Sequence, residues 1–303
     1  MDNQRKHYPE DHWLRSHDSE KAFHDYMDQQ GKAYSIVKNS FIQELLGDLR
    51  GKRFLDYGCG GGIFSVHAAK EGAAEVIGVD ALETALATAS FFARNEGVQN
   101  ICRFVHSSDF PTRFQQPRFD VILMKDVLEH VEDDQGLLEA ASQAIVPGGI
   151  LVLSTQNSLS LNFLIQGTYR RGIRRDKHWF GWDETHLRFY TPMSLNKHLK
   201  KTGFTSVAWR SVYIIPYKLQ APLKTGKKFI RVDALSWIDR ALGSVFPYNR
   251  LGWNIVVKAE ASPLISERIK VDSMPLEQVP VAPLVIASQS VRFQQQTPST
   301  GIR

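Results

Sequence analysis

Five small residues near position 60 interrupt an otherwise ordinary apolar pattern, and they are the first place where the chain could do chemistry. The chain there reads RFLDYGCGGG, in which a short apolar run ends at Asp56 and passes into Gly58, Gly60, Gly61 and Gly62. Glycine adopts positive φ angles and lets a ligand touch the backbone with no Cβ in between. A helix predicted directly after the turn would aim its unpaired amides at the same place, which favours a carboxylate or a phosphate.

Two histidines and a neighbouring acid are candidates for proton transfer. His130, in the sequence DVLEHV, carries an imidazole that can take a proton from an acceptor hydroxyl near neutral pH. A packed histidine that orients the loop explains the same residue equally well. His186, in the sequence ETHLRFY, could reach back over the site from a later part of the chain, and Glu129 has no stronger claim than either histidine.

The elements that must position these residues begin after a helical preface. Residues 1 to about 50 place apolar side chains at intervals of three or four, which predicts amphipathic helices. From Arg53 to Asn157 apolar runs alternate with helical stretches, and this alternation predicts βαβ units and a parallel sheet, whose ligands bind at the carboxyl ends of the strands. The predicted strands are RFLDYG, EVIGVD, ICRFVHSSD, FDVILMKD and ILVLSTQN, and the predicted helices lie near 63–71, 82–95 and 134–145.

After Asn157 the sequence predicts two insertions and a tail. Residues 158–191 are aromatic and basic, with too little periodicity to be core, and we interpret them as an insertion over the site. A helix at 192–202 and the strand FTSVAWRSVYII follow, then a second basic insertion at about 216–250 and a last strand, GWNIVVKAEA. Residues 262–303 are rich in Ser, Gln, Pro and Val, which predicts a tail without fixed structure.

Composition sets the broad class. The 303 residues are 43% hydrophobic and 23% charged, which is typical of a soluble globular protein, and the net charge of +5 permits an anionic partner without requiring one. Cys59 and Cys102 cannot build a disulfide framework and lack metal-ligand spacing, so a reducing compartment is expected. No run approaches the ~20 apolar residues of a membrane span. The expected location is cytoplasmic, at most peripheral to a membrane.

The glycine turn resembles the first motif of class I S-adenosylmethionine-dependent methyltransferases. It reads Asp56-x-Gly58-x-Gly60-x-Gly62, whereas a dinucleotide turn reads G-x-G-x-x-G and its pyrophosphate would be repelled by the aspartate. Later landmarks follow in the family's order, since FDVILMKDVLEHV resembles the fourth-strand motif and PGGILVLSTQN the turn into the fifth strand. The similarity covers about 54–204 and is most like the branch with ubiquinone-biosynthesis O-methyltransferases and related small-molecule and sugar methyltransferases.

This resemblance implies an architecture and a cofactor. The implied fold is a doubly wound α/β domain with a mostly parallel seven-stranded, Rossmann-like sheet and an antiparallel final strand at about 253–259. The implied cofactor is S-adenosylmethionine, with S-adenosylhomocysteine as product and with no metal. The domain boundaries are a helical cap at 1–50, a methyltransferase domain at 51–261 with insertions at about 158–191 and 216–250, and the tail at 262–303.

The resemblance also assigns roles to side chains at the strand ends. Asp80 would accept hydrogen bonds from the ribose hydroxyls, although a plain strand-end cap explains it as well. Asp109 would take the adenine amino group, with Phe110 beside the ring. Lys125 and Asp126 stand where the family lines the methyl-transfer site, but either could be a residue at a helix N-terminus. The implied cofactor-binding set is Asp56, Gly58, Gly60, Gly62, Asp80, Asp109, Phe110, Lys125 and Asp126, and the candidate catalytic residues are His130 and His186.

The implied reaction is transfer of a methyl group to a hydroxyl oxygen of a quinone-like, sugar-like or lipid-like small molecule by in-line displacement. The alternatives are an RNA, tRNA or nitrogen-directed methyltransferase, and a non-catalytic S-adenosylmethionine-binding protein. A nicotinamide-dependent oxidoreductase is disfavoured by the spacing of the turn. The sequence does not indicate an oligomeric state.

The two basic insertions leave the partner open. Cations beside aromatic rings suit RNA, but no recognised RNA-binding module accompanies them, so an anionic small acceptor is preferred to nucleic acid. The second insertion suits either an interfacial helix on anionic lipid, a peripheral membrane contact, or an ordinary capping helix, which is favoured. The residues of the first insertion are Arg170, Arg171, Arg174, Arg175, Lys177, Trp179, Phe180 and Trp182; those of the second are Lys218, Lys224, Lys227, Lys228, Arg231, Leu235, Trp237, Ile238, Leu242 and Phe246.

Overall fold

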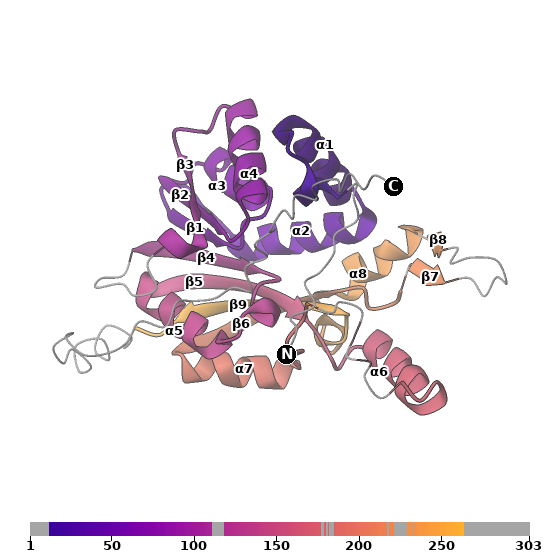
Figure 1. The fold of residues 1–303 in the computed structure, drawn as a ribbon. Helices are drawn as coiled ribbons and strands as arrows, with labels where there is room; N and C mark the ends of the chain where they lie inside the picture. The colour runs from indigo at the N-terminus through magenta and orange to yellow at the C-terminus, as the bar shows by residue number, and fades with distance from the viewer. Residues whose placement is uncertain are drawn as a thin grey trace, which may run out of the picture.

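A seven-stranded sheet forms the centre of the protein (Figure 1). The computed structural model describes residues 12–110, 118–176, 179, 181, 185–216, 218–220, 229–231 and 233–263. The strand order is β3-β2-β1-β4-β5-β9-β6; the first five strands are parallel, and β9 is antiparallel to both β5 and β6. The strands are β1 (Arg53–Tyr57), β2 (Glu75–Asp80), β3 (Cys102–His106), β4 (Phe119–Lys125), β5 (Ile145–Gln156), β6 (Phe204–Val212) and β9 (Asn254–Ala261).

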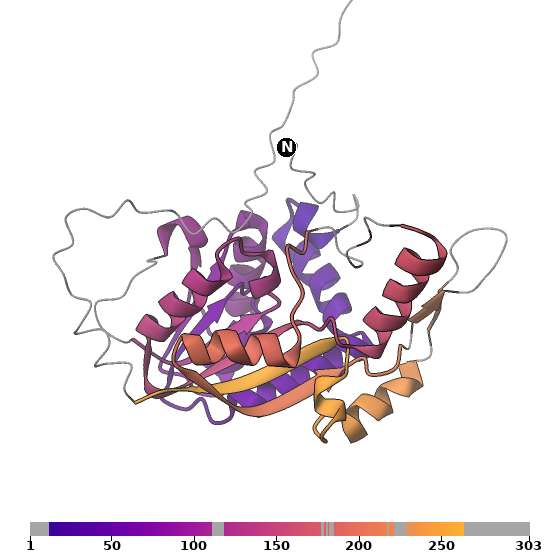
Figure 2. The ribbon, with the colours of Figure 1, turned by 90° about the horizontal axis from the view of Figure 1, so that it is seen from below.

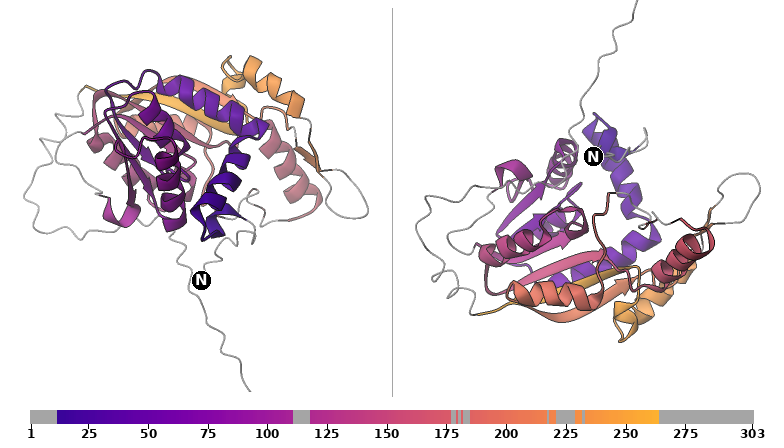
Figure 3. Two further views of the ribbon diagram at one scale, coloured as in Figure 1. Left: turned by 90° about the horizontal axis from the view of Figure 1, so that it is seen from above. Right: turned by 60° about the horizontal axis from the view of Figure 1, so that its bottom comes forward.

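Helices cover both faces of this sheet (Figures 2 and 3). One face carries α2 (Ala33–Leu46), α3 (Ile63–Lys70) and α4 (Glu83–Asn95), and α1 (Ser19–Gln30) packs outside α3 and α4. The other face carries α5 (Asp134–Ala144) and α7 (Pro192–Lys201). The strand order reverses between β1 and β4, and ligands of doubly wound sheets bind at such a switch point.

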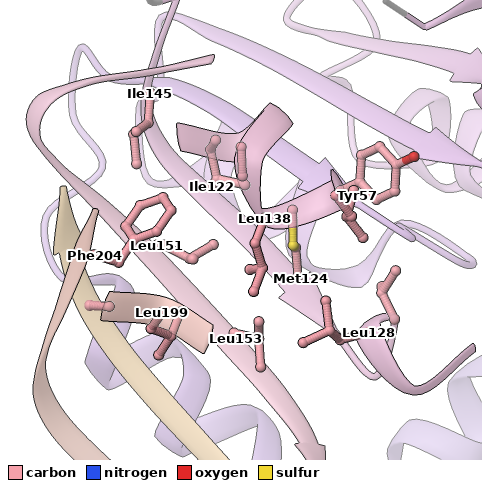
Figure 4. Packing of buried hydrophobic residues seen from close by; sticks show 14 of the residues in the cluster. Tyr57, Ile122, Met124, Leu128, Leu138, Ile145, Leu151, Leu153, Leu199 and Phe204 are labelled. Atoms are coloured by element: carbon pink, nitrogen blue, oxygen red, sulfur yellow. The ribbon is translucent and has the colours of Figure 1, made fainter. Parts of the chain in front are cut away.

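The core follows from the alternation of side chains along each strand. Met124 and Leu153 face α5 and α7, where they pack with Leu138, Leu199 and Phe204 (Figure 4). The intervening strand residues face α2 and α3 instead; among them are Phe54, Val121, Leu123 and Val152. Because both faces are covered, the strands read as nearly continuous apolar runs rather than as an alternating pattern.

Shorter elements decorate the carboxyl edge of the sheet. The insertion at 158–191 contains α6 (Leu161–Gly167) and a π-helical segment, η4 (Thr168–Ile173). The expectation that this insertion contributes nothing to the core is wrong for Phe163, Trp179 and Tyr190, which are buried. The other short elements are η1 (Trp13–Arg15), η2 (Ser107–Asp109), η3 (Leu128–His130), β7 (Lys218–Gln220), β8 (Phe229–Arg231), η5 (Asp233–Leu235), α8 (Ser236–Leu242) and η6 (Tyr248–Arg250).

The predicted fold class is confirmed, down to the antiparallel strand near the end of the domain. The helical preface is confirmed over 19–46, while residues 1–11 and the tail beyond 263 lie outside the described residues. Among the helices that the structure describes, none combines the length and the apolar character needed to cross a bilayer.

Candidate active site

The glycine turn joins β1 to α3 at the switch point of the sheet. Gly58, Gly60 and Gly62 have φ angles of 78°, 53° and 84°, all in the left-handed region that favours glycine. A Cβ on Gly58 would collide with Val127, and one on Gly62 would lie 2.8 Å from the Cβ of Ala89. A Cβ on Gly60 would meet nothing within 4 Å. Of these three glycines, Gly60 is therefore the one that opens onto space a ligand could fill, and the other two are also required by packing.

Asp80 lies against the same turn. One carboxylate oxygen accepts a hydrogen bond from the Gly60 amide at 2.9 Å, and the other accepts from the Leu82 amide at 3.0 Å. Burial raises the pKa of Asp80, while these two amides act in the opposite direction. Each carboxylate oxygen keeps a further lone pair. The side chain thus fixes the turn and can still accept hydrogen bonds from ligand hydroxyls beside Gly60.

Asp56 is buried at the end of β1. The Ser65 hydroxyl donates to its carboxylate at 2.7 Å. Burial raises the pKa of Asp56 to about 6, against the lowering effects of Ser65 and of the Lys125 ammonium. A buried carboxylate of this kind gains from a cation brought in by a ligand, because the cation compensates its desolvation.

The N-terminal helices cover the glycine turn, and the part that Tyr26 plays in this was not predicted from the sequence. A Cβ on Gly61 would lie 2.6 Å from the ring of Tyr26, so the ring packs directly on the backbone of the turn. The ring of Trp13 packs on Tyr26 in turn, at 4.9 Å between centroids. Burial and then the charge of Asp56 raise the pKa of Tyr26. Two buried aromatic rings from the first described helices, Trp13 and Tyr26, therefore cover the backbone of the turn at Gly61.

The side chains of Asp109 and Phe110 lie in different environments. Asp109 is exposed and accepts a hydrogen bond from the Ser108 hydroxyl at 3.2 Å. Phe110 is buried in the core, where its ring packs near Tyr57. His106, which the sequence analysis missed, donates from Nε2 to the Ala81 carbonyl at 2.9 Å and so ties the turn after β3 to the turn after β2. This tie brings the segment of Asp109 toward that of Asp80.

Lys125 is the last residue of β4 and Asp126 follows it, and neither caps a helix. Asp126 has a left-handed backbone with a φ of 54°, and its carboxylate forms an ion pair with Lys38 of α2. Ser154 and Asn254 donate to the same carboxylate at 3.0 and 2.9 Å. The sequence analysis missed Lys38 because a lysine within an amphipathic helix is normally solvated. Here it is 1% exposed.

These charged groups shift one another's pKa values. Burial alone would raise the pKa of Asp126, but the ammonium groups of Lys38 and Lys125 outweigh it and hold the pKa below the usual range. Burial and then the charge of Lys38 lower the pKa of Lys125 to about 8. The side chain of Lys125 lies over the ring of Phe64, 5.3 Å from its centroid. The end of β4 therefore holds the ammonium groups of Lys38 and Lys125 close to the carboxylate of Asp126, and Lys125 also interacts with Asp56.

A second polar cluster brings both candidate histidines together. The rings of His130 and His186 meet edge to face, 4.6 Å apart. Glu129 is fully buried beside them and accepts a hydrogen bond from the Thr155 hydroxyl at 2.8 Å. Burial and then the charge of Asp126 raise the pKa of Glu129 to about 8. One ligand atom from each of the three residues lies within 4.8 Å of the others, so the cluster could also hold a metal ion.

A short strap, residues 185–190, holds His186 in this cluster. The Leu187 amide donates to the Glu129 carbonyl at 2.8 Å. Arg188 donates to the carbonyls of Val131 and Glu132 at 2.6 and 2.7 Å and pairs with Asp134. His130 Nδ1 lies 3.3 Å from the Thr185 carbonyl. The strap therefore links the end of the first insertion to the loop after β4.

The structure describes only some of the basic and aromatic residues predicted in the two insertions. Arg171 donates to the Trp179 carbonyl at 3.1 Å and stacks on its ring, so one candidate cation is used within the insertion. Lys177, Phe180 and Trp182 lie outside the described residues, as do the side chains of 217–232 in the second insertion. In that insertion the buried carboxylate of Asp239 caps the end of β6 by accepting from the amides of Tyr213 and Ile214.

A doubly wound sheet with an accessible glycine turn and acids at its switch point defines a protein that binds a nucleotide-like cofactor. Residues 26–208, more than half of the chain, match the sequence model of a family described as a methyltransferase domain. The chain belongs to this family.

Curated relatives carry a common name. The ubiquinone biosynthesis O-methyltransferase of Idiomarina loihiensis is 32% identical over 187 residues, covering 60% of this chain and 73% of the relative. The enzyme of the same name from Bordetella avium is 36% identical over 132 residues, covering 44% of this chain and 54% of the relative. The chain thus matches only about half the length of some of these relatives.

Solved structures show the same fold. The magnesium protoporphyrin IX methyltransferase of Synechocystis, solved with bound S-adenosylhomocysteine, has a TM-score of 0.51 at 15% identity, covering 80% of this chain and 96% of that one. A Haloferax volcanii chain solved with a methyltransferase activator has a TM-score of 0.54 at 12% identity, covering 81% and 98%. At these identities the likeness concerns the fold alone.

Proposed function

We propose that the protein transfers a methyl group from S-adenosylmethionine to a hydroxyl oxygen of a small molecule. The observation that carries this proposal is the open space beside Gly60, bordered by the carboxylate of Asp80. Membership of the methyltransferase family supports the reaction, and the relatives named O-methyltransferases support oxygen as the acceptor atom.

The residues of the turn fit this cofactor chemically. Asp80 offers acceptors for ribose hydroxyls, and the exposed carboxylate of Asp109 is suited to an adenine amino group. The buried Asp56 would gain from the ammonium group of the amino acid end. Gly60 lets the ligand approach the backbone, and Tyr26 closes the turn above Gly61. The proposed binding set is thus the predicted one, with Tyr26 added and with Phe110 in a packing role.

The chemistry needs alignment and, at most, one base. The bound cofactor supplies a sulfonium methyl group, to which the acceptor oxygen forms a C–O bond as the C–S bond breaks and the sulfur keeps the electron pair. His130 is the proposed base: a proton on Nδ1, donated to the Thr185 carbonyl, leaves Nε2 in the acceptor form. His186 and Glu129 orient it. Holding acceptor and methyl group in line already contributes several kcal/mol, of the order of 7–11 in favourable cases.

The proposed acceptor is quinone-like, sugar-like or lipid-like, with an anionic group favoured. Lys38 pairs with Asp126 at the end of β4, and the ammonium group of Lys125 lies near both Asp126 and Asp56. The two ammonium groups at this end of the site can attract an anionic group of the acceptor. Nucleic acid is not favoured by any contact of the described arginines.

The test is calorimetric titration of the purified full chain with S-adenosylhomocysteine, with NADH in parallel. Binding of the first and none of the second is expected. Asp80→Asn should weaken S-adenosylhomocysteine by about tenfold, because an amide is a poorer partner for two hydroxyls. The matched control is Asp48→Asn, at an exposed acid away from the turn. A folded sample that does not bind S-adenosylhomocysteine would overturn the proposal.

A further inference from the structure

Three buried oxygen atoms near the ends of β4 and β5 and the start of β9 have no hydrogen-bond partner among the described residues. They are Oε1 of Glu129, Oε1 of Gln156 and Oδ1 of Asn254. A buried polar atom is normally paired, and one that is not is usually served by an ordered water or by a ligand. These three lie at the carboxyl edge of the sheet, where this kind of fold binds its ligands, and their position favours a ligand.

Gln156 and Asn254 lie opposite each other on two neighbouring strands (Figure 1). Gln156 is the last residue of β5, Asn254 is the first residue of β9, and the two are paired in the antiparallel register. Directly opposed residues of an antiparallel pair project from the same face of the sheet, with their Cβ atoms about 5 Å apart. The two amides can therefore contact one molecule, and β5 lies beside β4, whose end borders the proposed methyl-transfer site.

Neighbouring contacts engage the nitrogen of each amide. Nδ2 of Asn254 donates to the Asp126 carboxylate at 2.9 Å, and the opposite orientation of the amide would set two acceptors against each other. Asn254 is 1% exposed, so its Oδ1 has no access to bulk solvent. Nε2 of Gln156 lies 3.4 Å from Nε2 of His186. Both amides thus use their nitrogen within the protein and keep an oxygen, which accepts hydrogen bonds and cannot donate them.

The groups that would pair with these oxygens must be hydrogen-bond donors. A quinone carbonyl only accepts, and a hydrocarbon chain neither donates nor accepts, so neither can serve the two amide oxygens. A second cation is disfavoured, because Lys38 already pairs with the Asp126 carboxylate to which Asn254 donates. A hydroxyl group donates without adding charge. Two hydroxyl groups of one molecule therefore fit the pair of amides.

Aromatic rings border the same edge of the sheet. The ring of Phe189 lies 5.6 Å from that of His186 and 6.1 Å from that of Trp253, between centroids, and Trp253 directly precedes Asn254. Phe163 stacks on Trp253 at 6.0 Å. Ligand sites commonly combine such apolar rings with a few polar groups that fix orientation. A sugar-like ring, with hydroxyl groups at its edge and apolar C–H groups on its faces, suits this combination.

We propose that Gln156 and Asn254 select a polyhydroxylated, sugar-like methyl acceptor by accepting hydrogen bonds from two of its hydroxyl groups. This inference rests on the proposed function and narrows its acceptor to one of the classes named there. A third hydroxyl takes the methyl group: its C–O bond forms as the C–S bond of the cofactor breaks, and its proton passes to His130. Oε1 of Glu129, beside this base, is a further contact for the same molecule.

Methyl transfer by the full chain from radiolabelled S-adenosylmethionine to a panel of small molecules tests the proposal. The polyols are free hexoses, hexose 1-phosphates and nucleotide-linked hexoses, and the comparison compounds are a catechol, a hydroquinone and an aliphatic amine. We expect label in at least one polyol, with a kcat/KM at least about tenfold lower for every comparison compound, because these leave a buried oxygen unpaired.

Variants of Gln156 show whether its oxygen recognises the polyol. Gln156→Met keeps the length of the side chain but removes the oxygen, so KM for the polyol should rise about tenfold while S-adenosylhomocysteine affinity stays within about twofold. Gln156→Glu keeps an acceptor oxygen and should hold KM within about threefold. Asn254→Leu, checked for folding by circular dichroism, should act as Gln156→Met does. The matched control is Gln99→Met, at an exposed glutamine three residues before β3 at the opposite edge of the sheet, with KM unchanged.

The proposal would be overturned by label in a comparison compound alone, or by no labelled polyol in a chain that binds S-adenosylhomocysteine. An unchanged KM in Gln156→Met would also overturn it, since the oxygen would then be served by structural water. Equal losses in Gln156→Met and Gln156→Glu would assign the residue to positioning His186 through Nε2 instead. A folded chain that does not bind S-adenosylhomocysteine would overturn the proposed function itself, so calorimetry on the same samples keeps the two failures apart.

Discussion

Lys38 and Asp126 form an ion pair between α2 and the end of β4, although 88 residues separate them in the sequence. The Lys38 side chain is 2% exposed and that of Asp126 is 35% exposed, so the lysine is the more deeply desolvated partner. The pair connects the helical cap to the strand end where methyl transfer is proposed. Its loss should affect both stability and the site.

Replacing the lysine alone should destabilise the protein. Lys38→Met leaves Asp126 with a left-handed backbone, a partly buried charge and only neutral donors, and we expect a loss of about 2 kcal/mol in the free energy of unfolding, below the 3–5 kcal/mol of fully buried pairs. Urea denaturation measures it. The double variant Lys38→Met/Asp126→Asn should recover about half of the loss; a single variant as stable as the unmodified chain would show that the pair contributes nothing.

Substitutions of two glycines of the turn should have different effects, one mainly on ligand affinity and the other mainly on stability. Gly60→Ala places a methyl group in open space, so S-adenosylhomocysteine affinity should fall at least about tenfold while stability falls by only ~1 kcal/mol for the left-handed backbone. Gly62→Ala meets Ala89 and should cost more than about 2 kcal/mol in stability. Calorimetry and thermal unfolding of both variants check this. Equal affinity of Gly60→Ala and the unmodified chain would show that the ligand lies elsewhere.

Stability should fall with rising pH through the titration of Glu129. Its pKa of about 8 in the folded protein lies above that of the unfolded chain, so the unfolded state binds fewer protons between roughly pH 4.5 and 8. The slope from this group is at most about 1.4 kcal/mol per pH unit and vanishes above pH 8. Glu129→Gln should flatten the decline, which thermal unfolding across this pH window would reveal. Parallel curves for the two proteins would contradict the assignment.

His130→Gln should lower turnover more than cofactor affinity. A lost general base costs roughly a hundredfold or more in kcat, whereas the contacts around Gly60 and Asp80 remain, so S-adenosylhomocysteine should bind within about twofold. The measurement uses an acceptor found by screening hydroxylated small molecules for methyl uptake. His186→Gln is the companion variant, and full turnover in His130→Gln would assign the histidine a packing role.

Arg188 should act by fixing the strap. Arg188→Ala removes two donors to backbone carbonyls and the pairing with Asp134, so we expect a loss of about 1–2 kcal/mol in stability and a slower reaction with little change in S-adenosylhomocysteine affinity. Arg188→Lys keeps the charge but not the forked geometry and should restore only part of the rate. Unchanged kinetics in the alanine variant would separate the strap from the reaction.

The sheet and the glycine turn could be predicted from the sequence because both depend on local signals. The apolar runs that end at Asp56 and Asp80 and the glycines between them have a spacing that few structures share, and the fold class followed from it. Residue roles that depend on distant contacts were not readable. No residue near Lys38 in the sequence indicates its buried partner, Asp126. Phe110 was predicted to line the site because it follows Asp109, but its side chain is buried in the core.

The histidines show the same limit from the other side. His130 and His186 were each plausible candidates alone, although 56 positions separate them in the sequence. The strap brings their ring centroids to 4.6 Å from each other. The strap is held by an arginine and by backbone hydrogen bonds, which have no periodic signature. The sequence pattern therefore identified both histidines as candidates, but only the tertiary contacts show that they lie together.

The position of β9 has a consequence for the order in which the protein can be made. Among the strands that the structure describes, β6 pairs only with β9, and β9 lies between β5 and β6 although it is formed by Asn254–Ala261. During translation, β6 emerges from the ribosome some fifty residues before the strand that joins it to the sheet. Asn254 also supplies a donor to Asp126. The nascent chain must therefore remain without the complete seven-stranded sheet, and Asp126 without its donor Asn254, until almost all of the described domain has left the exit tunnel.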